Sequence, residues 1–190
     1  MPRSPFTVSE VTPDLESAFA ELWIRARIES GASEEWALRS STRERVSAAM
    51  ARPEVRLYLA RAGERSVGYA VLTQSPLSGL SDTPSVWIDQ VYVVPDARRQ
   101  GVAKALLATA TRYADEVGAD QIASCVPAEH RESNRFYARL GFSQFVVRRV
   151  TSTAGLRRKL TSERAAATVE TLQRRRSLRA RTTRAARFAR

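Results

Sequence analysis

Apolar and polar residues alternate in three segments of the first half of the chain, as they do in half-buried β-strands. The segment FTVSEV at residues 6–11 comes first. VRLYLAR at 55–61 and SVGYAVLT at 66–73 follow, joined by the turn sequence AGER. Two alternating runs on either side of a short turn that contains glycine predict a β-hairpin.

Between the first strand and the hairpin, apolar residues recur at the spacing that is typical of amphipathic helices. After a break at Gly31, residues 33–50 predict a second helical region that ends before Pro53. Trp36 and Val46 are expected to face inward from it. In the first helical region the apolar positions are Leu15, Phe19, Leu22, Trp23 and Ala26.

The second half begins with a continuous apolar strand, VWIDQVYVV at residues 86–94, of the kind that is buried on both faces of a sheet. A helix follows Gly101 and ends near Gly118. Its apolar stripe comprises Val102, Leu106, Ala110, Tyr113 and Val117. The remaining predicted elements are a short strand at 120–126, a helix at 131–140 and a final strand at 142–150.

The predicted elements follow the order β-α-α-β-β-β-α-β-α-β. Strands interrupted by helices in this way indicate the α/β class, with a mixed (α+β) sheet, rather than a helical bundle or an all-β sandwich. A chain of 190 residues is long enough for one domain with an appendage. We assign residues 1–150 to that domain and residues 151–190 to a C-terminal extension that is helical or disordered.

The formal net charge of +11 comes almost entirely from the extension. Residues 151–190 contain 12 arginines and lysines against two acidic residues, whereas the first 150 residues contain 19 basic and 18 acidic residues. A basic extension attracts polyanions through counterion release, with little sequence preference. Weak contact with a nucleic acid or another polyanion is therefore one expectation, and a solvated extension without a partner is the other.

Cys125 is the only cysteine, which excludes an internal disulfide and a cysteine-rich metal site. The apolar runs are too short to cross a bilayer, and the first residues lack the apolar core of a signal peptide. We therefore expect a cytoplasmic protein that binds no metal and contacts no membrane. The basic residues are nearly all arginines, with only two lysines, which indicates a bacterial source.

The segment DARRQGVAKALL at residues 96–107 joins two arginines and a glycine to the start of a helix. Amide N–H groups at a helix N-terminus point at one spot, where the helix dipole favours an anion. Arg98 and Arg99 add bidentate phosphate donors, while Gly101 and Ala103 leave the backbone accessible. The segment predicts a pyrophosphate site, although an ordinary surface turn can have the same residue types.

Two segments in register resemble the signatures of the GCN5-related N-acetyltransferase (GNAT) superfamily. The first, VYVVPDARRQGVAKALL, resembles the acetyl-CoA motif of that family, with Arg98, Gly101 and Ala103 at its defining positions. The second, NRFYARLGF, resembles a short helix that carries a tyrosine, here Tyr137, and is closed by leucine, glycine and phenylalanine. The resemblance covers about residues 6–150 and implies the GNAT fold, in which two neighbouring strands of the central sheet splay apart.

The resemblance implies acetyl-CoA as the cosubstrate and assigns residues to its binding. Its pantetheine arm would lie along the end of the 86–94 strand, and its diphosphate at the start of the helix that follows. His130 stands where many family members carry an asparagine; its imidazole offers a similar hydrogen bond or a rival base, or it only caps a helix. The implied cofactor-binding residues are Val91, Tyr92, Val93, Arg98, Arg99, Gln100, Gly101, Val102, Ala103, Lys104, His130 and Asn134.

Two residues are candidates for the proton transfers of acetyl transfer. By resemblance, Tyr137 matches the family's proton donor to the departing thiolate, and Asp89 matches a strand position where some members carry a glutamate. Burial of a carboxylate in an apolar strand raises its pKa, which suits a base. Alternatively, Tyr137 only packs beside Phe136, and Asp89 only hydrogen-bonds a neighbouring loop. Cys125 is expected to be a small, inert hydrophobe in a buried strand.

The implied function is transfer of an acetyl group to a primary amine, of a small molecule or a peptide, by direct attack in a ternary complex. Two alternatives stay open: a non-catalytic module that senses acyl-CoA, and a nucleic-acid-associated factor that acts through its basic extension. The chain would act as a monomer or a homodimer. Acidic and aromatic residues of the first two helical regions would suit a cationic amine: Trp23, Glu29, Glu34, Glu35 and Trp36.

Overall fold

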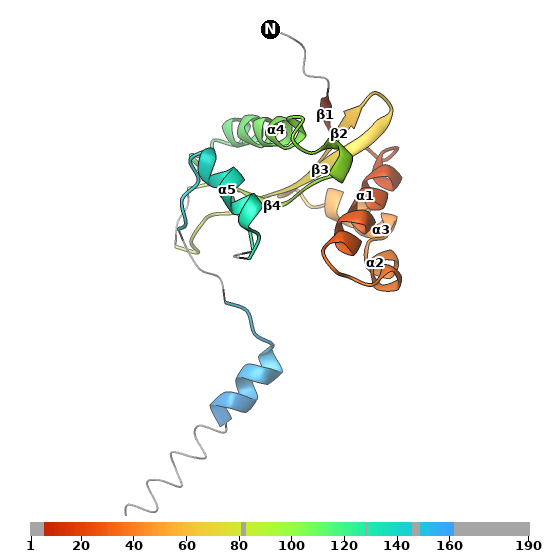
Figure 1. The fold of residues 1–190 in the computed structure, drawn as a ribbon. Helices are drawn as coiled ribbons and strands as arrows, with labels where there is room; N and C mark the ends of the chain where they lie inside the picture. The colour runs from red at the N-terminus through yellow and green to blue at the C-terminus, as the bar shows by residue number, and fades with distance from the viewer. Residues whose placement is uncertain (1–5, 81–82, 128, 146–148, 162–190) are drawn as a thin grey trace, which may run out of the picture. The chain divides into compact units, whose positions relative to one another are not determined.

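The fold is that of a computed structural model, which describes residues 6–80, 83–127, 129–145 and 149–161. The chain divides into two compact units, Met1–Arg135 and Phe136–Arg190. The first unit holds the whole sheet and the four helices that cover it (Figure 1).

Five strands form one mixed sheet in the order β1-β2-β3-β4-β5. Each of the first four strands pairs antiparallel with the next, and β5 pairs parallel with β4. The α/β class with a mixed sheet, predicted from the order of elements, is therefore confirmed. The strands are β1 (Thr7–Glu10), β2 (Val55–Ala62), β3 (Arg65–Gln74), β4 (Ser85–Val93) and β5 (Gln121–Ser124).

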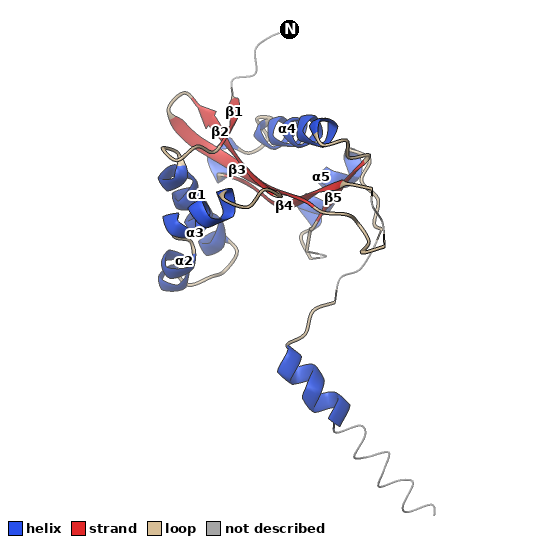
Figure 2. Cartoon of the chain, turned by 180° about the vertical axis from the view of Figure 1, so that it is seen from behind, coloured by secondary structure: helices blue, strands red, loops and turns tan. Residues whose placement is uncertain are grey.

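Helices cover both faces of the sheet. Figures 1 and 2 show α4 (Val102–Glu116) on one face and α1, α2 and α3 on the other. The predicted helical region at 33–50 is two helices, because the Thr42 hydroxyl accepts the Arg45 N–H and so caps a new helix. The three helices are α1 (Glu16–Glu29), α2 (Glu34–Ser40) and α3 (Arg43–Met50).

The core confirms most of the predicted apolar stripes. On α4, Leu106 is fully buried, and Val46 of α3 faces inward as expected. Trp36 of α2 does not, since 45% of it is exposed. Its ring lies against the Arg27 guanidinium instead of the sheet. Further buried residues of the α4 stripe and the strands beneath it are Val102, Ala110, Tyr113, Leu59, Leu72 and Ile88.

Gly68 of β3 lies where the sheet meets the start of α4. A Cβ at this position would stand 2.7 Å from the Tyr92 carbonyl oxygen and 3.2 Å from the Val102 Cγ1. We expect Gly68→Ala to destabilise the fold by about 1–3 kcal/mol, because neither backbone nor core can yield easily. Urea unfolding measures this loss. Gly79→Ala is the control, since a Cβ there meets nothing within 4 Å, and equal stability of the two variants would contradict the prediction.

The second unit begins within α5 (Arg131–Arg139), which ends before Gly141. The final strand predicted at 142–150 is absent from the described residues 142–145 and 149–150. Phe145 is 80% exposed and Val150 95%, so these two apolar residues do not pack against an apolar surface. Residues 153–161 of the extension form a helix, and residues 162–190 lie outside the described part of the chain.

Candidate active site

The edge of β4 that faces β5 is paired over only part of its length. Ser85–Ile88 pair with Gln121–Ser124, and the Cys125 N–H donates to the Ile88 carbonyl at 3.4 Å. Among the described residues, no strand pairs with this edge beyond that point. Backbone groups of an unpaired edge are available to an extended ligand. The unpaired part of β4 contains the predicted pantetheine residues Val91, Tyr92 and Val93.

A β-bulge lies where the two strands separate. On the other edge of β4, Val71 pairs with Gln90 and Leu72 pairs with Ile88, so Asp89 is the extra residue. Residues up to Ile88 are buried, whereas Asp89 and Gln90 are exposed. The prediction of a strand buried on both faces is therefore wrong beyond Ile88, because β5 ends there and the bulge interrupts the alternation of side chains.

Asp89 lies at this bulge, but not in the apolar surroundings that the sequence predicts. Its side chain is exposed, and its Oδ2 accepts a hydrogen bond of 2.5 Å from the Thr73 hydroxyl on β3. The burial expected for a base in an apolar strand is therefore absent. The alternative, a hydrogen bond to a neighbouring loop, is not seen either, because the partner belongs to the neighbouring strand. An exposed carboxylate at the start of an open strand edge still offers a proton acceptor, directly or through water.

A basic turn leads from β4 into α4. Arg99 has a φ of 62° and Gly101, the N-cap of α4, has a φ of 97°. Left-handed backbone at an arginine costs about 1–3 kcal/mol, and such conformations concentrate at ligand-binding sites. Among the described residues no side chain caps α4, so the first-turn N–H groups of Val102, Ala103 and Lys104 can bind an anion.

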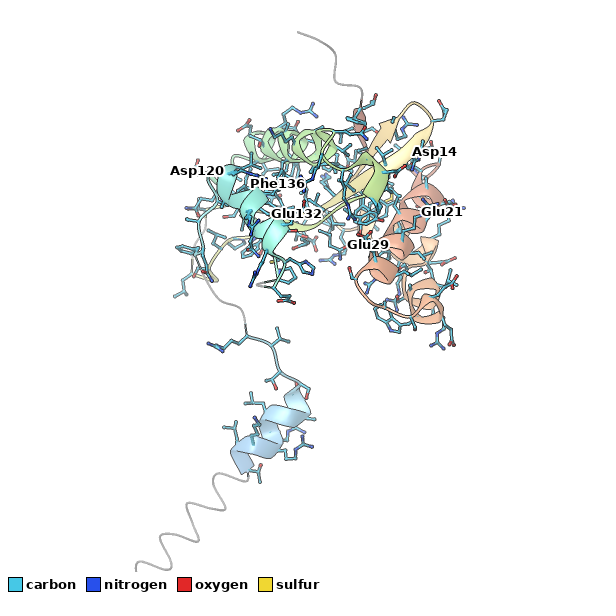
Figure 3. The ribbon with its side chains drawn as sticks, viewed as in Figure 1. Asp14, Glu21, Glu29, Asp120, Glu132 and Phe136 are labelled. Carbon is cyan, nitrogen blue, oxygen red and sulfur yellow. The ribbon has the colours of Figure 1, made fainter. Side chains whose placement is uncertain are left out.

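Carboxylates from two helices hold the arginines of this turn; Figure 3 labels both, Glu29 on α1 and Glu132 on α5. Arg98 pairs with Glu29, and its Nε donates to the Val93 carbonyl at 2.9 Å. The Arg99 Nη2 lies 3.0 Å from the Glu132 Oε1. Ion pairs this exposed are worth only about 0–1 kcal/mol, so a phosphate can compete for both arginines.

Two further predicted cofactor residues support this turn from within the chain. The Gln100 Nε2 donates to the Asp96 carbonyl at 2.7 Å, which closes the turn before α4. Tyr92 lies half-buried on β4. Its burial is the main cause that raises the pKa of its phenol, and its hydrogen bond with Glu29 is the second. Glu29 therefore joins the end of β4 to Arg98, a link that the sequence does not predict.

His130 and Asn134 come together at the start of α5. The Asn134 Nδ2 donates to the His130 carbonyl at 2.9 Å and to the Pro127 carbonyl at 3.0 Å. The His130 N–H also donates to the Pro127 carbonyl, at 3.0 Å. These contacts use the main chain of His130 and order the turn that begins α5. Contact of either side chain with a cofactor stays a prediction.

Tyr137 belongs to the second unit and is packed by aromatic neighbours. Its ring lies edge to face with Phe136, at 5.4 Å between centroids, and with Phe142, at 5.0 Å. The Phe142 N–H donates to the Tyr137 carbonyl at 3.1 Å, which closes the end of α5. The packing role that the sequence left open is therefore present. Because it uses the ring, it is compatible with a chemical role for the hydroxyl.

A polar cluster on the face of the sheet that α1 covers was missed in the sequence. The Tyr69 hydroxyl on β3 donates to the Gln90 Oε1 at 3.1 Å. Arg27 on α1 lies over the rings of Trp23 and Trp36, with its Cζ 4.9 and 4.7 Å from their centroids. The i, i+4 spacing of Trp23 and Arg27 is the one sequence signal that could have predicted part of this cluster. The tryptophans expected to receive a cationic amine already hold a cation of this chain.

Cys125 is exposed beyond the end of β5, so the expectation of a buried cysteine is wrong, because the strand ends at Ser124. Within the residues that the structure describes, no group of three or more His, Cys, Asp or Glu side chains could hold a metal ion. The described helices also include none with the length and apolar character needed to span a membrane.

The protein is thus an α/β protein with helices on both faces of a mixed sheet, in which an unpaired strand edge leads to a helix N-terminus without a side-chain cap among the described residues. The model of the acetyltransferase (GNAT) family matches residues 15–142. The chain belongs to this family, and the resemblance seen in its two signature segments is confirmed.

Individual relatives are more distant. An aminoglycoside N(6′)-acetyltransferase type 1 of Salmonella typhimurium is 28% identical over 89 residues, which are 46% of this chain and 61% of the relative. The chain thus spans about three fifths of the length of this curated relative. A solved structure described as a probable acetyltransferase is 26% identical, with a TM-score of 0.64 and coverage of 77% of this chain and 96% of that one.

A crystal structure of the aminoglycoside N-acetyltransferase AAC(6′)-Iy in complex with CoA has the same fold. Its TM-score is 0.64 at 20% identity, and the alignment covers 80% of this chain and 98% of that one. At this identity the likeness extends to the fold alone.

Proposed function

We propose that this chain is an acetyl-CoA-dependent N-acetyltransferase, which transfers an acetyl group to a primary amine by direct attack in a ternary complex. The observation that carries the proposal is the unpaired edge of β4 beyond Ile88, which leads into the basic turn at α4. Membership of the GNAT family supports it. The CoA complex of an enzyme with the same fold is consistent with it.

The residues present fit an extended ligand with a diphosphate. The N–H and C=O groups of Val91–Val93 would pair with the amides of a pantetheine arm, as an added strand does. The first-turn N–H groups of α4, together with Arg98 and Arg99, would bind the diphosphate. The left-handed turn at Arg99 and Gly101 would bring these groups to one side of the helix start.

The chemistry requires two proton transfers around the new bond. Acetyl-CoA supplies the acetyl group as a thioester, and as the amine nitrogen bonds to the acyl carbon the carbon–sulfur bond breaks. Asp89 at the bulge, His130, or water would take the proton that the amine loses. The resemblance assigns to the Tyr137 hydroxyl the proton that the departing thiolate gains. One bond forms and one breaks, and one proton is lost and one is gained, so the reaction balances without a covalent intermediate on the enzyme.

A turnover assay with the full chain tests the proposal. Acetyl-CoA is incubated with a panel of primary amines, and free CoA is followed with a thiol reagent, while calorimetry measures acetyl-CoA binding in parallel. We expect saturable binding and CoA release that depends on both the amine and the enzyme. Binding without release for every amine would favour the acyl-CoA sensor, and absence of binding would overturn the proposal altogether.

A further inference from the structure

We infer that Arg27 is the anchor for an anionic group of the acceptor, so that the preferred acceptor is a primary amine that also carries a carboxylate. The inference rests on the proposed function and names the substrate class for that site. It is carried by a half-buried arginine of α1 whose guanidinium lies against two indole rings and whose Nε is buried without a hydrogen-bond partner.

Arg27 is held in place but is not neutralised. Its guanidinium lies against the two indole rings, and its Nε is buried with no hydrogen-bond partner. Within the described part of the chain, no carboxylate forms an ion pair with it. Arg27 as a whole is half-buried, and the buried Nε–H without a hydrogen-bond partner is costly unless a ligand supplies an acceptor to the guanidinium. A bound acceptor carboxylate would supply it.

Arg27 lies on the helix that packs against β3, since the ring centroid of Phe19 on α1 is 4.8 Å from that of Tyr69. Burial raises the pKa of the Tyr69 phenol, and the positive charge of Arg27 acts on the same group in the opposite direction, so the two side chains are electrostatic neighbours. The Tyr69 hydroxyl in turn donates to Gln90, the residue that follows Asp89 at the bulge. A group bound at Arg27 would therefore reach toward the start of the open strand edge.

Two of the three acidic residues that were expected to attract a cationic amine form ion pairs with arginines. Glu29 pairs with Arg98, and the Glu35 Oε1 lies 3.3 Å from the Arg39 Nη1 on its own helix. Polycationic acceptors would also meet the positive charge of Arg27. Like charges close together in a partly desolvated site repel, whereas a planar guanidinium can engage a carboxylate through two parallel N–H···O bonds.

The two indole rings would also constrain how the acceptor carboxylate binds and what lies beside it. Once both rings lie against the guanidinium, its N–H groups are the parts left to bind a ligand, which favours a carboxylate in the plane of the group. Trp36 is 45% exposed, so one ring still offers apolar surface beside the anchor. The acceptor class is therefore an amino acid or a short peptide with a free carboxylate.

The test compares matched acceptors on the full-length wild-type protein. Each amino acid or dipeptide is offered as the free acid and as its C-terminal amide, alongside an aminoglycoside, and kcat/KM for acetylation is measured. The amine of the amide is less basic than that of the free acid, so a larger fraction of it is in the neutral, nucleophilic form. This difference alone would favour the amide, and it therefore cannot produce the expected preference for the acid. We expect the free acids to exceed their amides by about 10-fold or more, as for one charge-assisted contact. Equal values, or preference for the aminoglycoside, would overturn the inference.

An Arg27→Gln variant then assigns the preference to this residue. We expect the ratio of acid to amide to fall to near unity, mainly through KM for the acid, with Arg27→Lys retaining part of it. Arg39→Gln, an exposed arginine on the neighbouring helix, is the matched control and should keep the wild-type ratio. An unchanged ratio in Arg27→Gln would contradict the inference even where the wild type prefers acids.

Tryptophan fluorescence separates failure of this inference from failure of the proposed function. Binding of a free acid beside Trp23 and Trp36 should change their emission, and binding of the amide should not. An acid-specific change without turnover would support Arg27 as an anion anchor while overturning the acetyltransferase proposal. Turnover of acids and amides alike would retain the acetyltransferase and overturn the anchor. Should Arg27→Gln fail to fold, Arg27→Lys decides the matter: a reduced ratio of acid to amide supports the anchor, and an unchanged ratio overturns it.

Discussion

Replacement of Tyr137 with phenylalanine is expected to lower kcat about 100-fold or more, because a positioned general acid contributes 10²- to 10⁴-fold to such reactions. The sulfur of CoA gains a proton as the carbon–sulfur bond breaks. A phenol, whose ordinary pKa is about 10, is a well-matched donor to an alkyl thiolate. The substitution keeps the aromatic ring that packs on Phe136 and Phe142, so it removes the hydroxyl alone.

Steady-state kinetics with saturating acetyl-CoA measures this effect, and calorimetry should find acetyl-CoA affinity unchanged. Tyr113→Phe is the matched control, because the Tyr113 hydroxyl is buried in the core without a hydrogen-bond partner among the described residues. It should keep wild-type turnover. A Tyr137→Phe enzyme as fast as the parent would remove the acid role and leave the aromatic packing as the whole account of this residue.

Reversal of both charges in the basic turn is expected to abolish useful binding of acetyl-CoA. In Arg98→Glu/Arg99→Glu, two charge-assisted contacts worth about 1.5–3 kcal/mol each are lost and replaced by repulsion, so the Kd should rise about 100-fold or more. The exposed ion pairs with Glu29 and Glu132 are also lost, but these contribute little to stability. Calorimetry measures the Kd, and thermal unfolding verifies that the variant still folds.

The matched control carries the same change in net charge at a distant place. Arg39→Glu/Arg45→Glu alters two exposed arginines of α2 and α3, so any effect of overall charge on a polyanionic ligand is equal in the two variants. We expect this control to bind acetyl-CoA as the parent does. Parent-like binding by the Arg98/Arg99 variant, or equal weakening in both variants, would show that the turn is not the diphosphate site.

Much of the fold was predictable because it depends on local patterns. Alternation in two runs around Gly63 is enough for the hairpin of β2 and β3, and the stripe that begins at Val102 is enough for α4. The turn between β4 and α4 could also be found, since Arg98 and Gly101 belong to a segment with a family resemblance. The final strand could not, because an alternating run forms a strand only where another strand or an apolar surface receives it.

The composition of the candidate site was readable from the chain, but its pairings were not. Asp89, the basic turn and the aromatic residues of the first helices are all visible as residue types at defined positions. The end of β5 at Ser124 leaves Asp89 exposed and the rest of the β4 edge unpaired. The packing of α2 on α1 brings Trp36 against Arg27, which already lies over Trp23 of its own helix. The periodicity of the sequence therefore predicted the elements and their apolar faces. Contacts between residues distant in sequence depend on how the elements pack, so only the tertiary structure decided the pairings of the site residues.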